Sequence, residues 1–176
     1  MLTAVLDACV LVPISLADTL LTFADAGLFQ PLWSDLILVE VKRTMTGKLG
    51  MPEDRVTARL DQMNQAFPGA TVTGFEHLIP SMTNHPKDRH VLAAAIEGGA
   101  STIVTANITD FPSRATDPYG VRADPRRVSQ KSTGRCTGCR AQIFERSEKQ
   151  ICEASSFNRR VLYHIVQDRS FLREIG

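Results

Sequence analysis

The chain opens with the apolar run Leu2-Thr3-Ala4-Val5-Leu6, which stops at Asp7. A run of this length is short for a helix and predicts a buried strand. Further along the chain, the β-branched run Ser101-Thr102-Ile103-Val104-Thr105, which Gly and Asn107 bound, predicts another strand. Residues 70–73 predict a further strand, either at a sheet edge or buried. These runs and the segments between them decide the fold.

Helical spacing of apolar residues predicts helices at about 15–28, 34–45, 52–67 and 86–98. Ser34 is placed to cap the second of these, and Leu32-Trp33-Ser34 is read as the start of that helical unit. Strands that alternate with helices predict an α/β fold with a mainly parallel sheet.

Composition excludes several classes of protein. The chain has 176 residues, of which 43% are hydrophobic and 22% charged, close to the average of soluble globular proteins. The apolar stretch 5–29 is interrupted by three aspartates and two threonines, so no membrane span and no membrane partner are expected. The first charge, Asp7, is acidic, which does not fit a secretory signal. A cytoplasmic protein with reduced cysteines is the expectation.

Charge divides the chain near Gly120. Residues 1–120 hold 8 Lys and Arg against 13 Asp and Glu, a balance of −5, whereas residues 121–176 hold 12 against 6, a balance of +6. We therefore predict a folded domain over 1–120 and an atypical basic C-terminal extension over 121–176.

Four acidic residues are candidates for a functional site. Asp7 and Asp110 each follow a predicted strand, and carboxyl ends of parallel strands meet at one edge of a sheet. Asp88 begins a helix that starts near this edge, and Glu40 can reach it from the middle of its helix. Taken singly, each acid also fits an ordinary turn or helix-surface position. Gathered together, they would repel one another without a cation such as Mg²⁺ or Mn²⁺.

The residues at these positions resemble those of PIN-domain ribonucleases, most closely the toxins of VapBC-type toxin–antitoxin pairs. The resemblance covers about 2–120 and is carried by four motifs: Val5-Leu6-Asp7-Ala8-Cys9-Val10-Leu11, Ser34-Asp35-Leu36-Ile37-Leu38-Val39-Glu40, Asp88-Arg89-His90-Val91-Leu92-Ala93-Ala94-Ala95 and Ile103-Val104-Thr105-Ala106-Asn107-Ile108-Thr109-Asp110-Phe111-Pro112. It implies a three-layer sandwich with a central parallel sheet flanked by helices.

The resemblance also implies a metal-dependent endoribonuclease that hydrolyses RNA phosphodiester bonds. Its catalytic residues would be Asp7, Glu40, Asp88 and Asp110, of which Asp7, Asp88 and Asp110 would bind Mg²⁺ or Mn²⁺. Thr105 and Asn107 would support them by hydrogen bonds. Lys42, Arg43 and Arg89 are candidates for contacts with RNA phosphates, although exposed helix bases are usually a solvated face.

By the same resemblance, the partners would be RNA, a cognate antitoxin that crosses the acidic crevice, and a second copy of the chain in a homodimer. Leu20, Phe23 and Trp33 are candidates for a partner groove, although each singly fits core packing better. Lys87, directly before Asp88, departs from the more acidic sequence expected there. If its ammonium points into the site, it weakens metal binding, and Lys87→Asp would strengthen it.

The tail after Gly120 leaves three readings open: a basic arm for RNA, a small zinc element, or an altered 3′ end of the gene. Cys136, Cys139, Cys152 and His164 are the candidate zinc ligands, and residues around 157–169 predict an amphipathic helix. Two other functions compete with the nuclease. One is a catalytically impaired module that binds RNA or an antitoxin-like protein. The other is a phosphatase-like hydrolase with Asp7 as nucleophile, which would want an aspartate where Cys9 stands.

Overall fold

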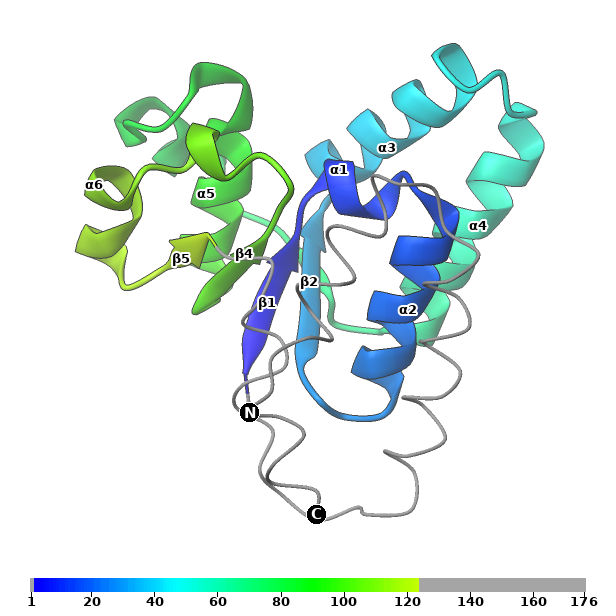
Figure 1. Ribbon diagram of the computed structural model, residues 1–176, viewed down its shortest axis with the longest axis horizontal. Helices are drawn as coiled ribbons and strands as arrows, with labels where there is room; N and C mark the ends of the chain where they lie inside the picture. Colours follow the sequence, from blue (N-terminus) through cyan, green and yellow to red (C-terminus); the bar gives the residue numbers. More distant parts are fainter. Residues whose placement is uncertain (1, 124–176) are drawn as a thin grey trace.

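A parallel sheet forms the centre of the molecule (Figure 1). The computed structural model describes residues 2–123. Its strands, in the spatial order β3-β2-β1-β4-β5, are β1 (Thr3–Leu6), β2 (Gln30–Ser34), β3 (Thr71–Val72), β4 (Thr102–Val104) and β5 (Arg122–Ala123). Every pairing among them is parallel. The predicted α/β class with a parallel sheet is confirmed.

Helices connect the strands and cover the sheet. They are α1 (Ala8–Leu11), α2 (Ile14–Asp25), α3 (Asp35–Gly47), α4 (Glu53–Ala66), α5 (Arg89–Glu97) and α6 (Ser113–Thr116), with the short 3-10 helices η1 (Glu76–Ser81), η2 (Pro86–Asp88), η3 (Ile108–Asp110) and η4 (Asp117–Tyr119). The predicted long helices correspond to α2, α3, α4 and α5. Ser34 caps α3 as expected, because its Oγ accepts a hydrogen bond from the amide of Ile37 at 3.3 Å.

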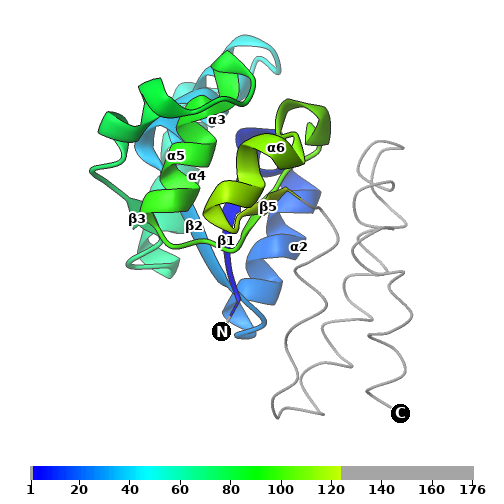
Figure 2. The ribbon, with the colours of Figure 1, turned by 90° about the vertical axis from the view of Figure 1, so that its left-hand side faces the viewer.

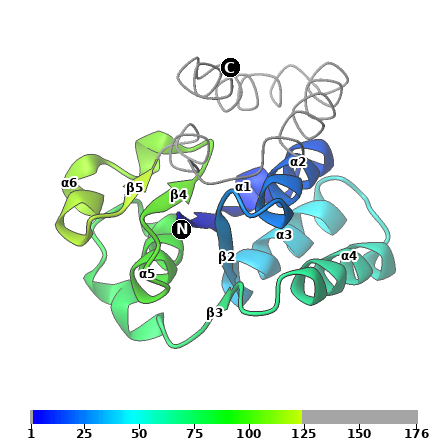
Figure 3. The same cartoon turned by 90° about the horizontal axis from the view of Figure 1, so that it is seen from below.

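Three layers result from this arrangement. Helix α5 packs against β1, β2 and β4. Figure 2 shows β1 between α5 and α2, so helices lie on both faces of the sheet. Helix α3 packs against α4 on the β2 side of the molecule, as seen from below in Figure 3. The structure therefore has the predicted helix–sheet–helix sandwich.

Strand β1 is the centre of the core. Ala4, Val5 and Leu6 are fully buried, and β1 pairs with β2 on one side and with β4 on the other. A strand that is covered on both faces and at both edges carries a continuous apolar run instead of an alternating one. This is why the apolar run at residues 2–6 predicts a buried strand of a parallel sheet.

Strand β2 corrects the expectation for residues 32–34. Leu32, Trp33 and Ser34 belong to this strand, and α3 begins only at Asp35. The strand was missed because Pro31 lies within it, and proline donates no hydrogen bond to a sheet. The neighbouring amides of Gln30 and Trp33 nevertheless bond to the carbonyls of Leu2 and Ala70, which keeps β2 between β1 and β3.

The predicted partner groove is wrong for its three residues. Leu20 and Trp33 are fully buried and Phe23 is 8% exposed. The Trp33 indole donates a hydrogen bond to Asn64 Oδ1 at 2.8 Å and meets the Phe67 ring edge-on, with 6.0 Å between ring centroids. These side chains fill the space between the sheet and α2 and α4, so they belong to the core.

The sheet continues past the position where the charge changes. Strand β5 lies at 122–123 and pairs with β4, so residues just beyond Gly120 complete its edge. The division of the chain at 120 stays a prediction. The predicted helix at 157–169 and the candidate zinc ligands Cys136, Cys139, Cys152 and His164 lie outside the described residues. Within residues 2–123, no helix is both long and apolar enough to span a membrane.

Candidate active site

Asp7 and Thr105 lie side by side at the carboxyl edge of the sheet. Leu6 pairs with Val104, so the residue after β1 and the residue after β4 emerge together, and the Asp7 amide donates to the Val104 carbonyl at 3.1 Å. The Thr105 hydroxyl donates a hydrogen bond of 2.7 Å to Asp7 Oδ2. Both residues are buried, so the neighbouring strand holds the Asp7 carboxylate in one orientation. The contact expected between Thr105 and the acids is present.

Cys9 is a second donor to Asp7 that sequence reasoning did not assign. Its thiol donates to Asp7 Oδ2 at 3.1 Å, and its Sγ accepts the Ala106 amide at 3.2 Å. Burial, followed by the negative charge of Asp7, raises the pKa of the Cys9 thiol to about 12. Cys9 is therefore a neutral hydrogen-bond donor at physiological pH, which argues against a nucleophilic role.

Asp7, Glu40 and Asp88 line one cavity of about 410 Å³. They come from different elements: Asp7 from the turn after β1, Glu40 from α3, and Asp88 from the cap position of α5. Asn107 also lines this cavity, and its backbone amide donates to the Thr105 hydroxyl at 3.0 Å. Residues that are distant in sequence thus meet at the edge where the parallel strands end.

Asp110 joins this group through Lys87. The Lys87 ammonium lies 3.1 Å from Asp110 Oδ2 and 3.7 Å from Asp88 Oδ2. The hydrogen bond from Lys87 lowers the pKa of Asp110. Burial raises the pKa of Asp88 to about 7; Lys87 opposes this rise, and the charges of Asp7 and Asp110 add to it. Asp88 and Asp110 therefore contact the same ammonium, but the pKa of Asp88 lies above its ordinary value and the pKa of Asp110 lies below it.

His85 is a further candidate ligand that sequence reasoning missed. Ligand atoms of His85, Asp88 and Asp110 lie within 4.8 Å of one another. The backbone keeps them together, because the His85 amide donates to the Asp110 carbonyl at 3.1 Å and the Asp88 amide to the His85 carbonyl at 2.9 Å. The signal in the sequence is weak: a histidine three residues before an aspartate, brought round to it by the tight turn of η2.

Glu40 faces the half-buried His90. Its Oε2 lies 3.8 Å from His90 Nε2, a nitrogen that is buried without a hydrogen-bond partner among the described residues. This separation is too long for a direct hydrogen bond. His90 is therefore a neighbour that becomes an ion-pair partner of Glu40 only when it is protonated.

The predicted basic residues divide into those at the cavity and those outside it. Arg43 lines the cavity, together with Lys48, which was not predicted, and Lys87. Lys42 instead forms an ion pair of 2.9 Å with Glu53 of α4. Arg89 points its Nε at the carbonyl of Asn84 at 3.5 Å and is not among the residues that line the cavity. Three basic side chains thus face the three carboxylates of the cavity.

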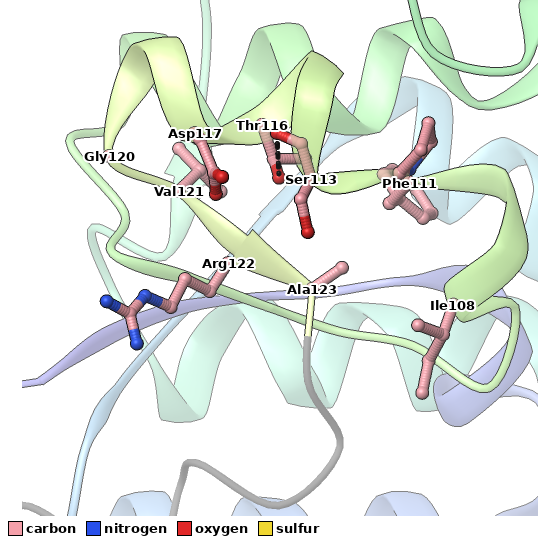
Figure 4. A pocket seen from close by; sticks show the side chains of 10 residues that line it. Ile108, Phe111, Ser113, Thr116, Asp117, Gly120, Val121, Arg122 and Ala123 are labelled. Carbon is pink, nitrogen blue, oxygen red and sulfur yellow. Dashed lines mark hydrogen bonds between the residues drawn. The ribbon is translucent and has the colours of Figure 1, made fainter.

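A second hollow, of about 640 Å³, lies beside β5 (Figure 4). Its lining includes Ile108, Phe111 and Val121, and its charged members are Asp117 and Arg122. Although this hollow is larger, it gathers no cluster of carboxylates. By its chemistry, the smaller acidic cavity is the candidate active site.

The acidic cavity fits a divalent cation. Asp88 Oδ2 is buried and has no hydrogen-bond partner among the described residues, and Asp88 as a whole is only 5% exposed. A buried carboxylate oxygen without a donor is costly unless a cation is bound to it. Carboxylates at one point, with a histidine beside them, match the oxygen-rich donor sets of Mg²⁺ and Mn²⁺.

Comparison with known proteins gives one family and one relative. A family model described as PIN domain matches residues 3–109. The chain is 41% identical over 83 residues to a curated protein of Mycobacterium tuberculosis strain H37Rv named "Putative ribonuclease VapC50"; the alignment covers 47% of each chain. The chain thus matches about half the length of this relative. No solved structure matches significantly.

Proposed function

The chain belongs to the PIN-domain family, and on this premise we propose that it is a metal-dependent endoribonuclease that hydrolyses RNA phosphodiester bonds. One observation carries the proposal. Asp7, Glu40 and Asp88, from three separate elements, line a single cavity at the carboxyl edge of the sheet, with Asp110 beside Asp88. The name of the matched relative agrees with a ribonuclease.

Asp7, Asp88 and Asp110 would hold Mg²⁺ or Mn²⁺, and His85, whose ligand atom lies within 4.8 Å of those of Asp88 and Asp110, would add a further donor. Such a cation supplies Lewis-acid stabilisation of phosphate oxygens and makes water more acidic. Thr105 and Cys9 both donate to Asp7 Oδ2, so they fix the orientation of the carboxylate without occupying its other oxygen. The role of Thr105 is to orient Asp7.

Glu40 is suited to move a proton. Its side chain is 31% exposed, whereas Asp7 and Asp88 are buried, so Glu40 is the lining carboxylate with the easiest access to water. We assign to its Oε atoms the role of accepting the proton of the attacking water.

Arg43 and Lys48 would bind the RNA backbone. Both side chains are exposed, and both line the cavity that holds the acids. Phosphate contacts of this kind position a nucleic acid without reading its sequence. Lys42 and Arg89 are not assigned to this role, because their charged groups face Glu53 and Asn84 instead.

We further propose that the protein is the toxin of a type II toxin–antitoxin pair and acts in the cytoplasm. Its cognate antitoxin would cover the acidic cavity, and the toxin would form a homodimer. The motifs shared with VapC-type toxins support this setting. Purification of the chain with the product of an adjacent small gene, followed by loss of cleavage in the complex, would test it.

A second candidate is a catalytically impaired module that binds RNA or an antitoxin-like protein. The position of Lys87 favours it, because an ammonium between Asp88 and Asp110 already supplies part of the charge that a metal would bring. The two candidates differ in one respect: only the nuclease cleaves RNA, and its cleavage requires the acidic residues of the cavity.

The deciding experiment is cleavage of an end-labelled structured RNA with Mn²⁺ or Mg²⁺. Wild type is compared with Asp7→Asn and Asp88→Asn, and with Asp61→Asn, an exposed acid on α4, as the matched control. Loss of several kcal/mol of charge stabilisation predicts a fall of about 100-fold or more in both site variants. Equal cleavage by all four proteins would reveal a contaminant, and folded wild type that never cleaves would favour the binding module.

A further inference from the structure

Among the basic residues that line the cavity, Lys87 is the one that forms ion pairs with candidate metal ligands within the described part of the chain. It belongs to η2, one position before Asp88, and its ammonium contacts both Asp88 and Asp110. Its side chain is 55% exposed, whereas those of Asp88 and Asp110 are 8% and 21% exposed. The two carboxylates are thus held in place by the fold, while the lysine reaches them from the solvent side.

The ammonium satisfies this pair of carboxylates only in part. Its contact with Asp110 is short enough for a hydrogen bond, at 3.1 Å, but the contact with Asp88 Oδ2 is 3.7 Å. Within residues 2–123, Asp88 Oδ2 therefore remains buried without a hydrogen-bond donor. A small cation between the two carboxylates and His85 could reach all three, because their ligand atoms lie within 4.8 Å of one another.

Displacement of the ammonium should be easy. Lysine carries a compact charge at the end of a flexible four-carbon stem, and it regains solvation and rotamer freedom when it leaves. Because the ammonium is the exposed partner of this ion pair, it can return to water while the two carboxylates stay in place. A divalent ion brings twice the charge to the same carboxylates.

We propose that Lys87 is a built-in counter-ion, which occupies the cation position between Asp88 and Asp110 and which a divalent ion must displace in order to bind. The inference rests on the proposed function only in so far as the acidic cavity binds a divalent cation. On this proposal, competition from the Lys87 ammonium lowers the affinity of the site for a divalent ion.

The test is a calorimetric titration of the full chain with Mn²⁺ at low, constant salt. Lys87→Met removes the ammonium but keeps the length of the side chain, and Lys87→Arg keeps the charge. Arg55→Met, at an exposed position on α4, removes one positive charge elsewhere and controls for net charge. All variants contain the same residues 124–176, so Mn²⁺ that binds there contributes equally to each titration and does not affect the comparison between variants.

Lys87→Met is expected to bind Mn²⁺ about tenfold more tightly than wild type, equivalent to about 1.4 kcal/mol. Lys87→Arg and Arg55→Met are expected to bind as wild type does. Mn²⁺ should raise the unfolding temperature of Lys87→Met more than that of wild type, because it binds the variant more tightly.

Equal affinity of Lys87→Met and wild type would overturn the inference, and so would Lys87→Arg binding as tightly as Lys87→Met. Mn²⁺ binding that survives Asp88→Asn unchanged would also overturn it, because the ion would then lie elsewhere. Tighter binding by Lys87→Met without RNA cleavage by any variant would uphold the counter-ion and reject the nuclease. The two ideas therefore fail separately.

Discussion

Replacing Thr105 by valine tests whether the strand next to β1 holds the site together. Thr105 Oγ1 donates to Asp7 Oδ2 at 2.7 Å and accepts the Asn107 amide at 3.0 Å. Valine has nearly the same shape but makes neither hydrogen bond. Because Thr105 is fully buried, water cannot easily replace the lost hydroxyl.

The size of the effect follows mainly from these two contacts; Thr105 Oγ1 also lies 3.4 Å from Cys9 Sγ, and valine loses this weaker contact as well. A hydrogen bond to a charged group contributes about 1.5–3 kcal/mol and a neutral one about 0.5–1.5 kcal/mol. Thr105→Val is therefore expected to lower the free energy of unfolding by roughly 2–4 kcal/mol at neutral pH. Because Asp7 loses its orientation, divalent-ion affinity and cleavage should also fall about 10–100-fold.

Thr102 provides a matched control in the same segment. It lies in β4 and is fully buried, but its hydroxyl oxygen has no hydrogen-bond partner among the described residues. Thr102→Val removes an unsatisfied polar atom, so it should leave stability unchanged or raise it. The two substitutions are chemically identical and differ only in what the hydroxyl contacts.

The assay is urea unfolding of both full-length variants, in chelator, followed by circular dichroism. The expected result is a lower midpoint for Thr105→Val than for Thr102→Val, with similar slopes. Equal midpoints would refute the reasoning, because they would mean that the bond to Asp7 stabilises nothing. A lower midpoint with normal Mn²⁺ binding would show that Thr105 supports the fold but does not orient Asp7.

Three further outcomes are expected. Gly98→Ala should destabilise the protein by about 1–3 kcal/mol in urea unfolding, because the added Cβ would lie 2.7 Å from Leu32 Cδ1 and 2.9 Å from Val72 Cγ2; an unchanged midpoint would contradict this packing. Cys9 should resist iodoacetamide at pH 8 in peptide-mapped mass spectra, because burial raises its pKa to about 12; rapid labelling of the folded chain would count against it. Burial also raises the pKa of Asp88 to about 7, so the folded state binds more protons than the unfolded state between about pH 4 and 7. Stability in chelator should therefore fall as pH rises through this window, and a pH profile like that of Asp88→Asn would refute the assignment.

Part of the fold could be read directly from local sequence. The apolar run of β1, the Ser34 cap and the proline before α4 act over a few residues, and the structure confirms the elements that they predict. Strand β2 was not predicted because Pro31 interrupts its short apolar run, and the run is buried only because β1 and β3 pair with it on either side. Whether a short apolar segment forms a strand or a helix depends on the elements that pack against it, and the local sequence pattern does not contain that information.

The candidate site divides in the same way. The rule that parallel strands end at one edge placed Asp7 and the residues after β4 together, and the structure agrees. The roles of Lys42 and Arg89 could not be judged from charge alone, because their partners come from α4 and from the backbone before η2. His85 and Cys9 were not assigned because their contacts form only when the chain folds: His85 lies beside Asp88 and Asp110, and Cys9 Sγ lies between Asp7 Oδ2 and the Ala106 amide.

By itself, the sequence determined the class of fold, and it predicted which acids lie at the carboxyl edge of the sheet. These depend on strand hydrophobicity and chain direction, which are local properties of the residues. Only the tertiary structure decided that Trp33 is core, that Arg43 and Lys48 face the cavity, and that Lys87 lies between Asp88 and Asp110. The physical reason is that burial and electrostatic pairing depend on distances between segments far apart in the chain, which are set when the layers pack.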